Sequence, residues 1–213
     1  MDFSLFTQEV SKIKKLELPG VESHYKMAPM ERLEALRKLN TEGAAPRKAG
    51  VMALFYPKED MQTHLLLILR NTYPGVHSNQ VGFPGGKHEE SDKDLLHTAL
   101  RETEEEVGVP ATQVTVIRKL SELYIPPSNF EVHPYIGLYH EARPFKVDQT
   151  EVAALVEVSL NEFMDDSIVR NKIMTTSYAS SIAVPAFILN GYTVWGATAM
   201  MLSEIKELFK QSL

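Results

Sequence analysis

Residues 85–109 read GGKHEESDKDLLHTALRETEEEVGV: a glycine pair, a polar turn and a helical pattern that runs to a further glycine. Ser91 predicts the N-cap of this helix, because a serine oxygen can accept a hydrogen bond from the first turn, and the aspartates that follow suit the helix dipole. Gly108 predicts its end, since a left-handed residue is favoured there. We therefore expect a helix over residues 91–107 with one buried side.

The last turns of this helix are crowded with acids, Glu102, Glu104, Glu105 and Glu106. Exposed carboxylates near a helix C-terminus oppose the dipole at about 0.3–1 kcal/mol each. Glu102 and Glu106 also form an i,i+4 pair of like charge, which costs roughly 0.2–0.5 kcal/mol more. Helical spacing puts Glu102, Glu105 and Glu106 on one face. Converging carboxylates are hard ligands for Mg²⁺ or Mn²⁺, so we interpret this face as a metal site rather than a solvated acidic surface.

Short apolar runs on both sides of this segment predict strands. They cover residues 50–56, 64–70, 81–83, 114–120, 132–139, 153–158 and 181–189. Pro185 weakens the last strand or puts it at a sheet edge. Further helices are expected over residues 2–15, 30–39 and 194–210, with a Gly- and Pro-containing linker over residues 40–48. This arrangement favours an α/β fold with a mixed sheet covered on both faces.

The organisation along the chain suggests two parts. Residues 1–45 are expected to form an N-terminal helical extension packed on the core, and residues 46–213 the catalytic domain. The chain has 213 residues, 44% hydrophobic and 23% charged, which is ordinary for a globular protein.

Charge and cysteine content narrow the function classes. The net charge of −6 and pI of about 5.7 argue against broad nucleic-acid binding. No cysteine is present, which excludes disulfides, zinc–thiolate sites and cysteine nucleophiles. The N-terminal residues carry charges throughout, unlike a secretory signal, and no apolar run approaches the roughly 20 residues that span a bilayer. We expect a cytoplasmic protein with neither nucleic acid nor membrane as a partner.

Residues 101–109 resemble the second half of the Nudix box, with Thr103 in its apolar position. The first half departs from the box. Asp92 stands six residues after Gly86, where the family prefers glutamate, and the gap to Arg101 is one residue longer. The resemblance implies a Nudix-type α/β/α sandwich and metal-dependent hydrolysis of a pyrophosphate bond in a nucleoside diphosphate derivative.

A second resemblance concerns the substrate. Leu69-Arg70, followed by HSNQVGFPGG over residues 77–86, is similar to the coenzyme A pyrophosphatase branch of Nudix enzymes, with Asn79 in place of a glycine. The sequence YTVWGATA at residues 192–199 also resembles that branch. The implied reaction cleaves coenzyme A or acyl-coenzyme A to adenosine 3′,5′-bisphosphate and 4′-phosphopantetheine or its acyl form.

The resemblance implies roles for particular residues. Glu102, Glu105 and Glu106, with the backbone carbonyl of Gly86, are expected to hold Mg²⁺ or Mn²⁺. Arg101 is expected to orient the glutamates through charge-assisted hydrogen bonds. The expected catalytic residues are Arg101, Glu102 and Glu105, and the expected substrate-binding residues are Arg70, Phe83, Gly85 and Glu151. The general base stays open between Glu105 and a later carboxylate, Glu131 or Glu151.

Several other side chains have a competing, purely structural interpretation. Arg47 and Lys48 could meet a ribose 3′-phosphate, but basic residues in a linker are usually solvated. His77 is better explained as a residue that fixes its loop. Tyr124 and Phe130 could stack on an adenine, although aromatics beside prolines usually pack a loop, and Trp195 is most simply a core residue on the last helix.

Two alternatives remain for the function as a whole. The substrate could be ADP-ribose or another nucleoside diphosphate derivative, because the box alone does not distinguish these. The domain could also be a non-catalytic ligand sensor, which the three retained glutamates disfavour. In each case the partner is a small-molecule nucleotide, and the protein is expected to be a monomer or homodimer.

Overall fold

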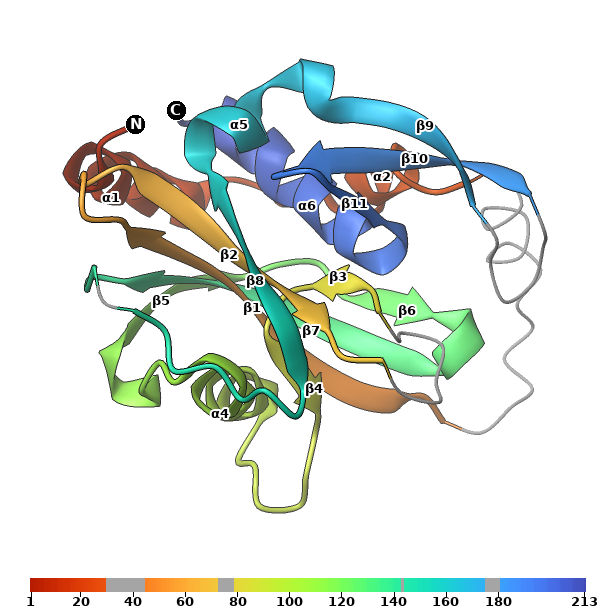
Figure 1. Ribbon diagram of the computed structural model, residues 1–213, viewed down its shortest axis with the longest axis horizontal. Helices are drawn as coiled ribbons and strands as arrows, with labels where there is room; N and C mark the ends of the chain where they lie inside the picture. Colours follow the sequence, from red (N-terminus) through yellow and green to blue (C-terminus); the bar gives the residue numbers. More distant parts are fainter. Residues whose placement is uncertain (30–44, 73–78, 143, 175–180) are drawn as a thin grey trace.

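The computed structural model describes residues 1–29, 45–72, 79–142, 144–174 and 181–213. Its central feature is an eight-stranded sheet with the main order β3-β2-β1-β7-β5, in which β4 pairs with β1, β6 with β7 and β8 with β2 (Figure 1). The strands are β1 (Arg47–Pro57), β2 (Thr63–Arg70), β3 (Val81–Gly82), β4 (Gly85–Lys87), β5 (Val114–Lys119), β6 (Leu123–Ile125), β7 (Phe130–Tyr139) and β8 (Val152–Ser159).

The sheet is mixed, as the sequence predicted. β1 and β7 run parallel, and the other pairings among its described strands are antiparallel. Successive side chains of a strand point to opposite faces. Met52 and Leu54 therefore belong to the apolar cluster beneath the helix α4 (Leu95–Val107), whereas Phe55 belongs to the larger cluster on the opposite face. Coverage of both faces explains why these strands read as continuous apolar runs.

One face of the sheet carries α4 (Leu95–Val107), which packs on β1 and β4 (Figure 1). The helix ends at Gly108, whose φ of 72° is the expected left-handed stop. Its start differs from the prediction. Asp94, rather than Ser91, is the N-cap, and its side chain accepts a hydrogen bond from the His97 backbone N–H. Both residue types suit an N-cap, so sequence spacing alone did not separate them.

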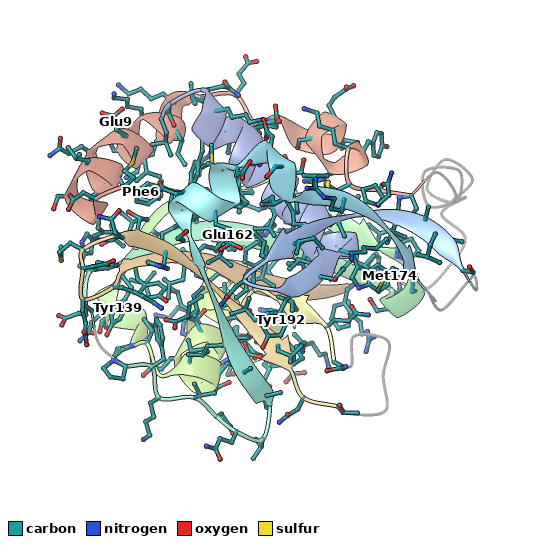
Figure 2. The ribbon with its side chains drawn as sticks, turned by 45° about the horizontal axis from the view of Figure 1, so that its top comes forward. Phe6, Glu9, Tyr139, Glu162, Met174 and Tyr192 are labelled. Carbon is teal, nitrogen blue, oxygen red and sulfur yellow. The ribbon has the colours of Figure 1, made fainter. Side chains whose placement is uncertain are left out.

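The opposite face is covered by the N-terminal helices, α6 and a second, three-stranded sheet (Figure 1). Phe6, which is labelled in Figure 2, lies against Phe55 of β1 and Phe209 of the last helix, with ring centroids 5.2 and 5.5 Å away. The N-terminal segment, the sheet and the last helix thus share one core. The elements here are α1 (Phe3–Val10), η1 (Ser11–Lys15), α2 (Gly20–Tyr25) and α6 (Gly196–Lys210), where η denotes a 3-10 helix.

The second sheet has the order β11-β10-β9 and consists of β9 (Val169–Met174), β10 (Ile182–Leu189) and β11 (Tyr192–Trp195). Pro185 lies in the central strand, but β11 pairs with β10 only from Ala186 onward. Pro185 therefore has a strand partner on one side only, as expected for a residue without a backbone N–H. The remaining short helices are α5 (Leu160–Met164), η2 (Ala111–Gln113), η3 (Pro126–Ser128) and η4 (Asp166–Ile168).

Two further sequence predictions need correction. The last helix begins at Gly196, because residues 192–195 form β11, so Trp195 lies in a strand and is half-buried. Arg47 and Lys48 are not in a linker but open β1. The predicted helix over residues 30–39, most of the predicted linker, and His77 lie outside the described residues.

No helix among the described residues is both long enough and apolar enough to cross a membrane.

At Gly50 the backbone of α4 lies directly against the sheet. A Cβ there would lie 2.2 Å from the Leu95 carbonyl oxygen and 2.9 Å from the Ala99 backbone nitrogen. We predict that Gly50→Ala lowers the free energy of unfolding by roughly 3 kcal/mol, because backbone atoms cannot give way as a flexible side chain would. Gly82→Ala is the matched control, since its Cβ would meet only Thr198 Oγ1 at 3.8 Å. Urea unfolding of both variants tests this; equal midpoints would contradict it.

Candidate metal centre

Three carboxylates converge beside the glycine turn that precedes α4. Glu102 and Glu106 are one turn apart on the helix, and Glu151 lies just before β8. One oxygen from each lies within 4.8 Å of the others. Glu151 is brought here by strand pairing, because its carbonyl accepts a hydrogen bond of 2.8 Å from the Asn71 backbone N–H, directly after β2. Segments that are far apart in the sequence therefore contribute carboxylates to one acidic cluster.

Glu106 is the most buried member, with 1% of its side chain exposed. Its Oε2 accepts a hydrogen bond of 2.8 Å from the Gly85 backbone N–H. Its Oε1 lies 3.3 Å from the Arg70 guanidinium but accepts no hydrogen bond from the described residues. Burial raises the pKa of Glu106 to about 8, against the opposing effect of Arg70. A buried carboxylate with one unsatisfied oxygen is a site at which a cation would restore the lost solvation.

Glu102 lies against the glycine turn. A Cβ built on Gly86 would be 2.3 Å from the Glu102 carboxyl carbon, so a larger residue at position 86 would displace the Glu102 carboxylate from its present place. Burial raises the pKa of Glu102, and the neighbouring Arg101 opposes that shift. The structure thus brings Gly86 and Glu102 together.

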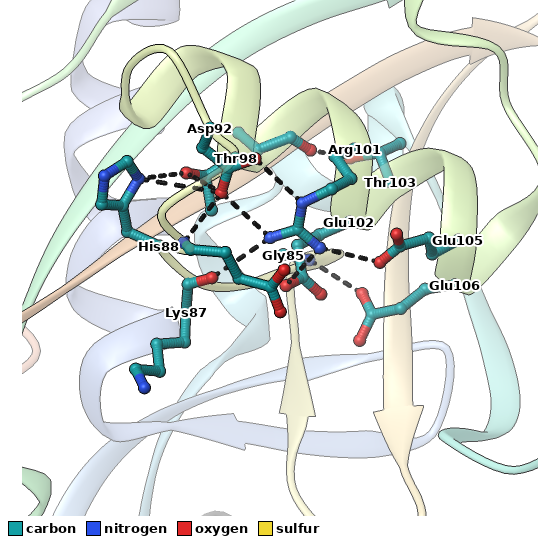
Figure 3. Close-up of polar contacts among 12 residues, drawn as sticks. Gly85, Lys87, His88, Asp92, Thr98, Arg101, Glu102, Thr103, Glu105 and Glu106 are labelled. Atoms are coloured by element: carbon teal, nitrogen blue, oxygen red, sulfur yellow. Dashed lines mark hydrogen bonds and ion pairs between the residues drawn. The ribbon is translucent and has the colours of Figure 1, made fainter.

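Arg101 organises the acids around it (Figure 3). Its Nε and Nη2 donate to the two oxygens of Asp92 at 2.9 and 3.1 Å, and its Nη1 donates to Glu105 at 2.8 Å and lies 3.0 Å from Glu102. Hydrogen bonding to Arg101 holds the pKa of Asp92 well below its usual range. A planar guanidinium held on one side by a buried carboxylate is fixed in orientation for the glutamates on its other side.

Asp92 is the position at which the sequence departs from the family pattern. In the structure it is the residue that holds the Arg101 guanidinium in place. Its side chain is fully buried, and it also accepts from Thr98 Oγ1 at 2.9 Å and lies 3.0 Å from His97 Nδ1. Its spacing from Gly86 was the only signal that could have indicated this. Thr98 and His97 carried no such signal.

Glu105 does not join the carboxylate cluster. Its side chain is 57% exposed and its oxygen is bonded to Arg101. The three acids gathered in the structure are therefore Glu102, Glu106 and Glu151, whereas the spacing argument grouped Glu102, Glu105 and Glu106. Glu131, the other carboxylate considered as a base, lies against His133 instead.

The structure places the expected substrate-binding residues in two different environments. Arg70 and Gly85 adjoin the cluster, since Arg70 donates a hydrogen bond of 3.3 Å to the Gly85 carbonyl and also faces Glu106. Arg70 is therefore held in place by the Gly85 carbonyl and by Glu106. Phe83, by contrast, is 3% exposed and lies in the larger apolar cluster.

Asn79 explains one departure from the sequence signature. Its φ is 55°, a left-handed conformation that glycine adopts freely and asparagine tolerates better than most residues. The substitution of asparagine for the usual glycine therefore preserves the backbone path of this loop.

The residues named as doubtful in the sequence have structural partners. Arg47 lies over the Phe130 ring at 4.2 Å and donates to the Ser128 carbonyl at 2.8 Å. Tyr124 donates its hydroxyl to Asn129 Oδ1 at 3.0 Å, across the turn formed by η3. These contacts agree with the interpretation of these side chains as loop packing.

The donor set fits a hard divalent cation. Carboxylate oxygens are the ligands of Mg²⁺ and Mn²⁺ in proteins, and a cation among three acids would relieve both their mutual repulsion and the burial of Glu106. Such a site could bind phosphate oxygens of a substrate and activate water.

Comparison with known proteins identifies relatives of this chain. A family model described as the NUDIX domain matches residues 46–175. A protein from Yersinia pestis (strain Pestoides F), named Uncharacterized Nudix hydrolase NudL, is 35% identical over 143 residues, covering 67% of this chain and 71% of the relative. A protein of the same name from Yersinia pseudotuberculosis serotype O:1b (strain IP 31758) matches with the same identity and coverage.

Solved structures match the fold. A C. elegans Ap4A hydrolase in a binary complex aligns with a TM-score of 0.51 and 16% identity, over 78% of this chain and 99% of that one. RenU, a Nudix hydrolase from M. Smegmatis, aligns with a TM-score of 0.53 and 16% identity, over 79% and 89%. At this identity the likeness establishes the fold alone, an α/β sandwich with a mixed sheet.

The raised pKa of Glu106 predicts how stability depends on pH. A carboxyl whose pKa is about 8 when folded and ordinary when unfolded keeps its proton in the folded state only, so it destabilises the fold increasingly as pH rises between those values. In EDTA, we expect stability relative to Glu106→Gln to fall by at most about 1.4 kcal/mol per pH unit over this window. Saturating Mg²⁺ should reverse the loss. Unfolding midpoints that move in parallel for both proteins, with and without Mg²⁺, would contradict this.

Proposed function

The chain belongs to the Nudix hydrolase family, and we propose that the diphosphate it cleaves is that of coenzyme A or an acyl-coenzyme A. The observation that carries the reaction class is the cluster of Glu102, Glu106 and Glu151 beside the glycine turn. Enzymes of this family generally use a divalent metal and act on small nucleotide substrates. In our proposal Mg²⁺ or Mn²⁺ is held by Glu102 and Glu106, with Glu151 and the Gly86 carbonyl as further ligands.

A bound cation of this kind neutralises the diphosphate and lowers the pKa of a coordinated water. The protein's own contribution is positional. Arg101, anchored by Asp92, holds Glu102 and Glu105 in fixed orientations. Arg70 and the Gly85 N–H hold Glu106 from two sides. This preorganisation removes the entropy cost of gathering the acids in each catalytic cycle.

The proton of the attacking water needs an acceptor, and two carboxylates qualify. Glu105 is exposed and its carboxylate contacts Arg101, and it is the candidate we retain from the sequence. Glu151 is exposed too and lies within the cluster itself. Glu131 is disfavoured, because its carboxylate is bonded to His133 rather than directed at the cluster.

The choice of coenzyme A depends on residues outside the box. The segment over residues 77–86 resembles the coenzyme A pyrophosphatase branch, and its one departure, Asn79, has the backbone conformation of the glycine it replaces. In our proposal Arg70, Gly85, Phe83 and Glu151 contribute to the substrate site, Phe83 indirectly from its buried place in the larger apolar cluster. A ligand-sensing domain without hydrolysis is disfavoured by the intact acidic cluster.

We further propose that residues 46–213 are the catalytic domain and residues 1–45 an extension that stabilises it. Two contacts support this division. Phe6 packs against Phe55 and Phe209, and the buried His24 lies 3.1 Å from Glu204 of α6. The extension thus holds α6, which lies beyond the matched NUDIX segment, onto the sheet.

The first prediction for this function concerns the glutamates. We expect no hydrolysis after EDTA treatment, and a kcat lowered by about 10²-fold or more in Glu106→Gln and in Glu105→Gln, through loss of a ligand and of a base. Manganese affinity, measured by electron paramagnetic resonance, should fall in Glu106→Gln and be retained in Glu105→Gln.

Glu104→Gln is the matched control on the same helix. Glu104 is exposed and accepts a hydrogen bond from the Ala111 N–H, away from the cluster. Its kcat should stay close to that of the unaltered protein. Turnover in Glu106→Gln equal to that of this control would remove Glu106 from the site, and undiminished turnover in EDTA would remove the metal.

The second prediction concerns the substrate. Coenzyme A should yield adenosine 3′,5′-bisphosphate and 4′-phosphopantetheine, identified by mass. If the 3′-phosphate makes a charge-assisted contact, dephospho-coenzyme A should have a kcat/KM lower by roughly tenfold or more. ADP-ribose serves as the comparison substrate under the same metal conditions. Intact coenzyme A alongside rapid ADP-ribose cleavage would refute the substrate while leaving the reaction class.

A further inference from the structure

A second cluster of ligating side chains lies apart from Glu102 and Glu106, where β7 meets the segment between β5 and β6. It consists of Glu122, Glu131 and His133, each of which offers one atom within 4.8 Å of the others. Glu131 and His133 are alternate residues of β7, so both point to the face of the sheet that carries α4. Glu122 precedes β6 and reaches across to them. This cluster plays no part in the proposed hydrolysis.

His133 is the buried member and points into the cluster. Only 5% of the residue is exposed. Its Nε2 lies 2.8 Å from Glu131 Oε1, a normal hydrogen-bond distance, whereas its Nδ1 forms no hydrogen bond within the described part of the chain. When Nε2 donates to Glu131, Nδ1 carries a lone pair. A carboxylate that accepts a hydrogen bond from one ring nitrogen, and thereby orients the other nitrogen toward the ion, is the usual support of a metal-binding histidine.

The position of Glu122 agrees with a shared ion. His133 Nδ1 lies 3.3 Å from Glu122 Oε1, with no hydrogen bond between them. Two ligands of one tetrahedral Zn²⁺, each bonded at about 2.0–2.1 Å, are separated by about 3.3–3.4 Å. The observed separation therefore matches two ligands of one ion. The side chains of Glu122 and Glu131 are 48% and 31% exposed, so an ion could enter from solvent and complete its coordination with water.

We propose that His133 Nδ1 and the Glu122 carboxylate bind a divalent transition-metal ion of the zinc class, and that Glu131 orients His133 through its hydrogen bond with Nε2. An imidazole nitrogen distinguishes this site from the all-oxygen cluster at Glu102, because nitrogen ligands favour Zn²⁺ or Co²⁺ over Mg²⁺. The bound ion would tie the segment between β5 and β6 to the adjacent strand β7, beside the start of α4. The inference is independent of the substrate and of the hydrolytic site.

A neighbouring lysine competes with any ion for the Glu122 carboxylate. The Lys119 ammonium lies 2.6 Å from Glu122 Oε1, the same oxygen that faces His133. The positive charge of Lys48 also attracts the Glu122 carboxylate. An ion at this site must compete with Lys119 for that oxygen. Removing the ammonium should therefore strengthen metal binding. If the cluster were instead only a histidine held by hydrogen bonds between two carboxylates, Zn²⁺ would bind neither to the unaltered protein nor to the Lys119→Met variant.

The experiment is a Zn²⁺ titration by calorimetry of the intact protein in excess Mg²⁺, which occupies oxygen-only sites. Co²⁺ absorption spectra report whether a nitrogen ligand is present. The variants are His133→Asn, Glu122→Gln, Glu131→Gln and Lys119→Met. His64→Asn is the matched control, because His64 is half-buried and bonded to the Gln62 carbonyl, outside the cluster. Glu122→Gln changes a half-exposed side chain, so it keeps the test valid if His133→Asn fails to fold.

We expect one Zn²⁺ equivalent in the unaltered protein and in His64→Asn. Its affinity should fall about 10–100-fold in Glu131→Gln, the range for loss of a carboxylate that supports a ligating histidine. It should be lost in His133→Asn and in Glu122→Gln and tightened in Lys119→Met. Absence of Zn²⁺ binding to the unaltered protein and to Lys119→Met would overturn the proposal, as would binding that persists unchanged in Glu122→Gln.

Discussion

Glu106 places a carboxylate at the junction of a helix and a sheet, where solvent reaches 1% of its side chain. Burial alone would force it to keep a proton, and its pKa of about 8 reflects that cost. Two contacts offset part of the cost, the Gly85 N–H and the Arg70 guanidinium. One oxygen nevertheless lacks a hydrogen bond among the described residues. A cation bound between Glu106 and the neighbouring carboxylates of Glu102 and Glu151, as we propose, would replace this missing interaction.

The rest of the structure makes this burial possible. Gly50 lets the backbone of α4 pack directly against β1, and Gly86 leaves room for the Glu102 carboxylate. A Cβ at Gly50 would overlap the Leu95 carbonyl oxygen, and a Cβ at Gly86 would overlap the Glu102 carboxylate in its present position. Arg101 is held by the buried Asp92 and in turn holds two glutamates (Figure 3). Repulsive acids at the negative end of a helix are therefore kept in place by packing and by charge, at the expense of stability in the cation-free protein.

How much of this could be predicted from the sequence depends on whether the information was local. The helix and its acidic face followed from spacing, and Gly108 marked its end correctly. The third acid of the cluster was not predictable in this way. Glu151 reaches the site through pairing of β2 with β8, a contact between residues about eighty apart in the chain. Glu105 has helical spacing that fits the cluster but is drawn away by Arg101. The last two residues of β11 were assigned to the final helix, because an apolar run of this length does not distinguish strand from helix.

The central claim is that Glu102 and Glu106 hold a divalent cation, and it is most directly tested by locating that cation. A crystal of the protein soaked in Mn²⁺ and measured at a wavelength sensitive to manganese would give an anomalous difference map. The account predicts a peak within bonding distance of carboxylate oxygens of Glu102 and Glu106, and its absence from crystals of Glu106→Gln. A map with no manganese at these residues, in crystals whose cluster is open to solvent, would contradict it.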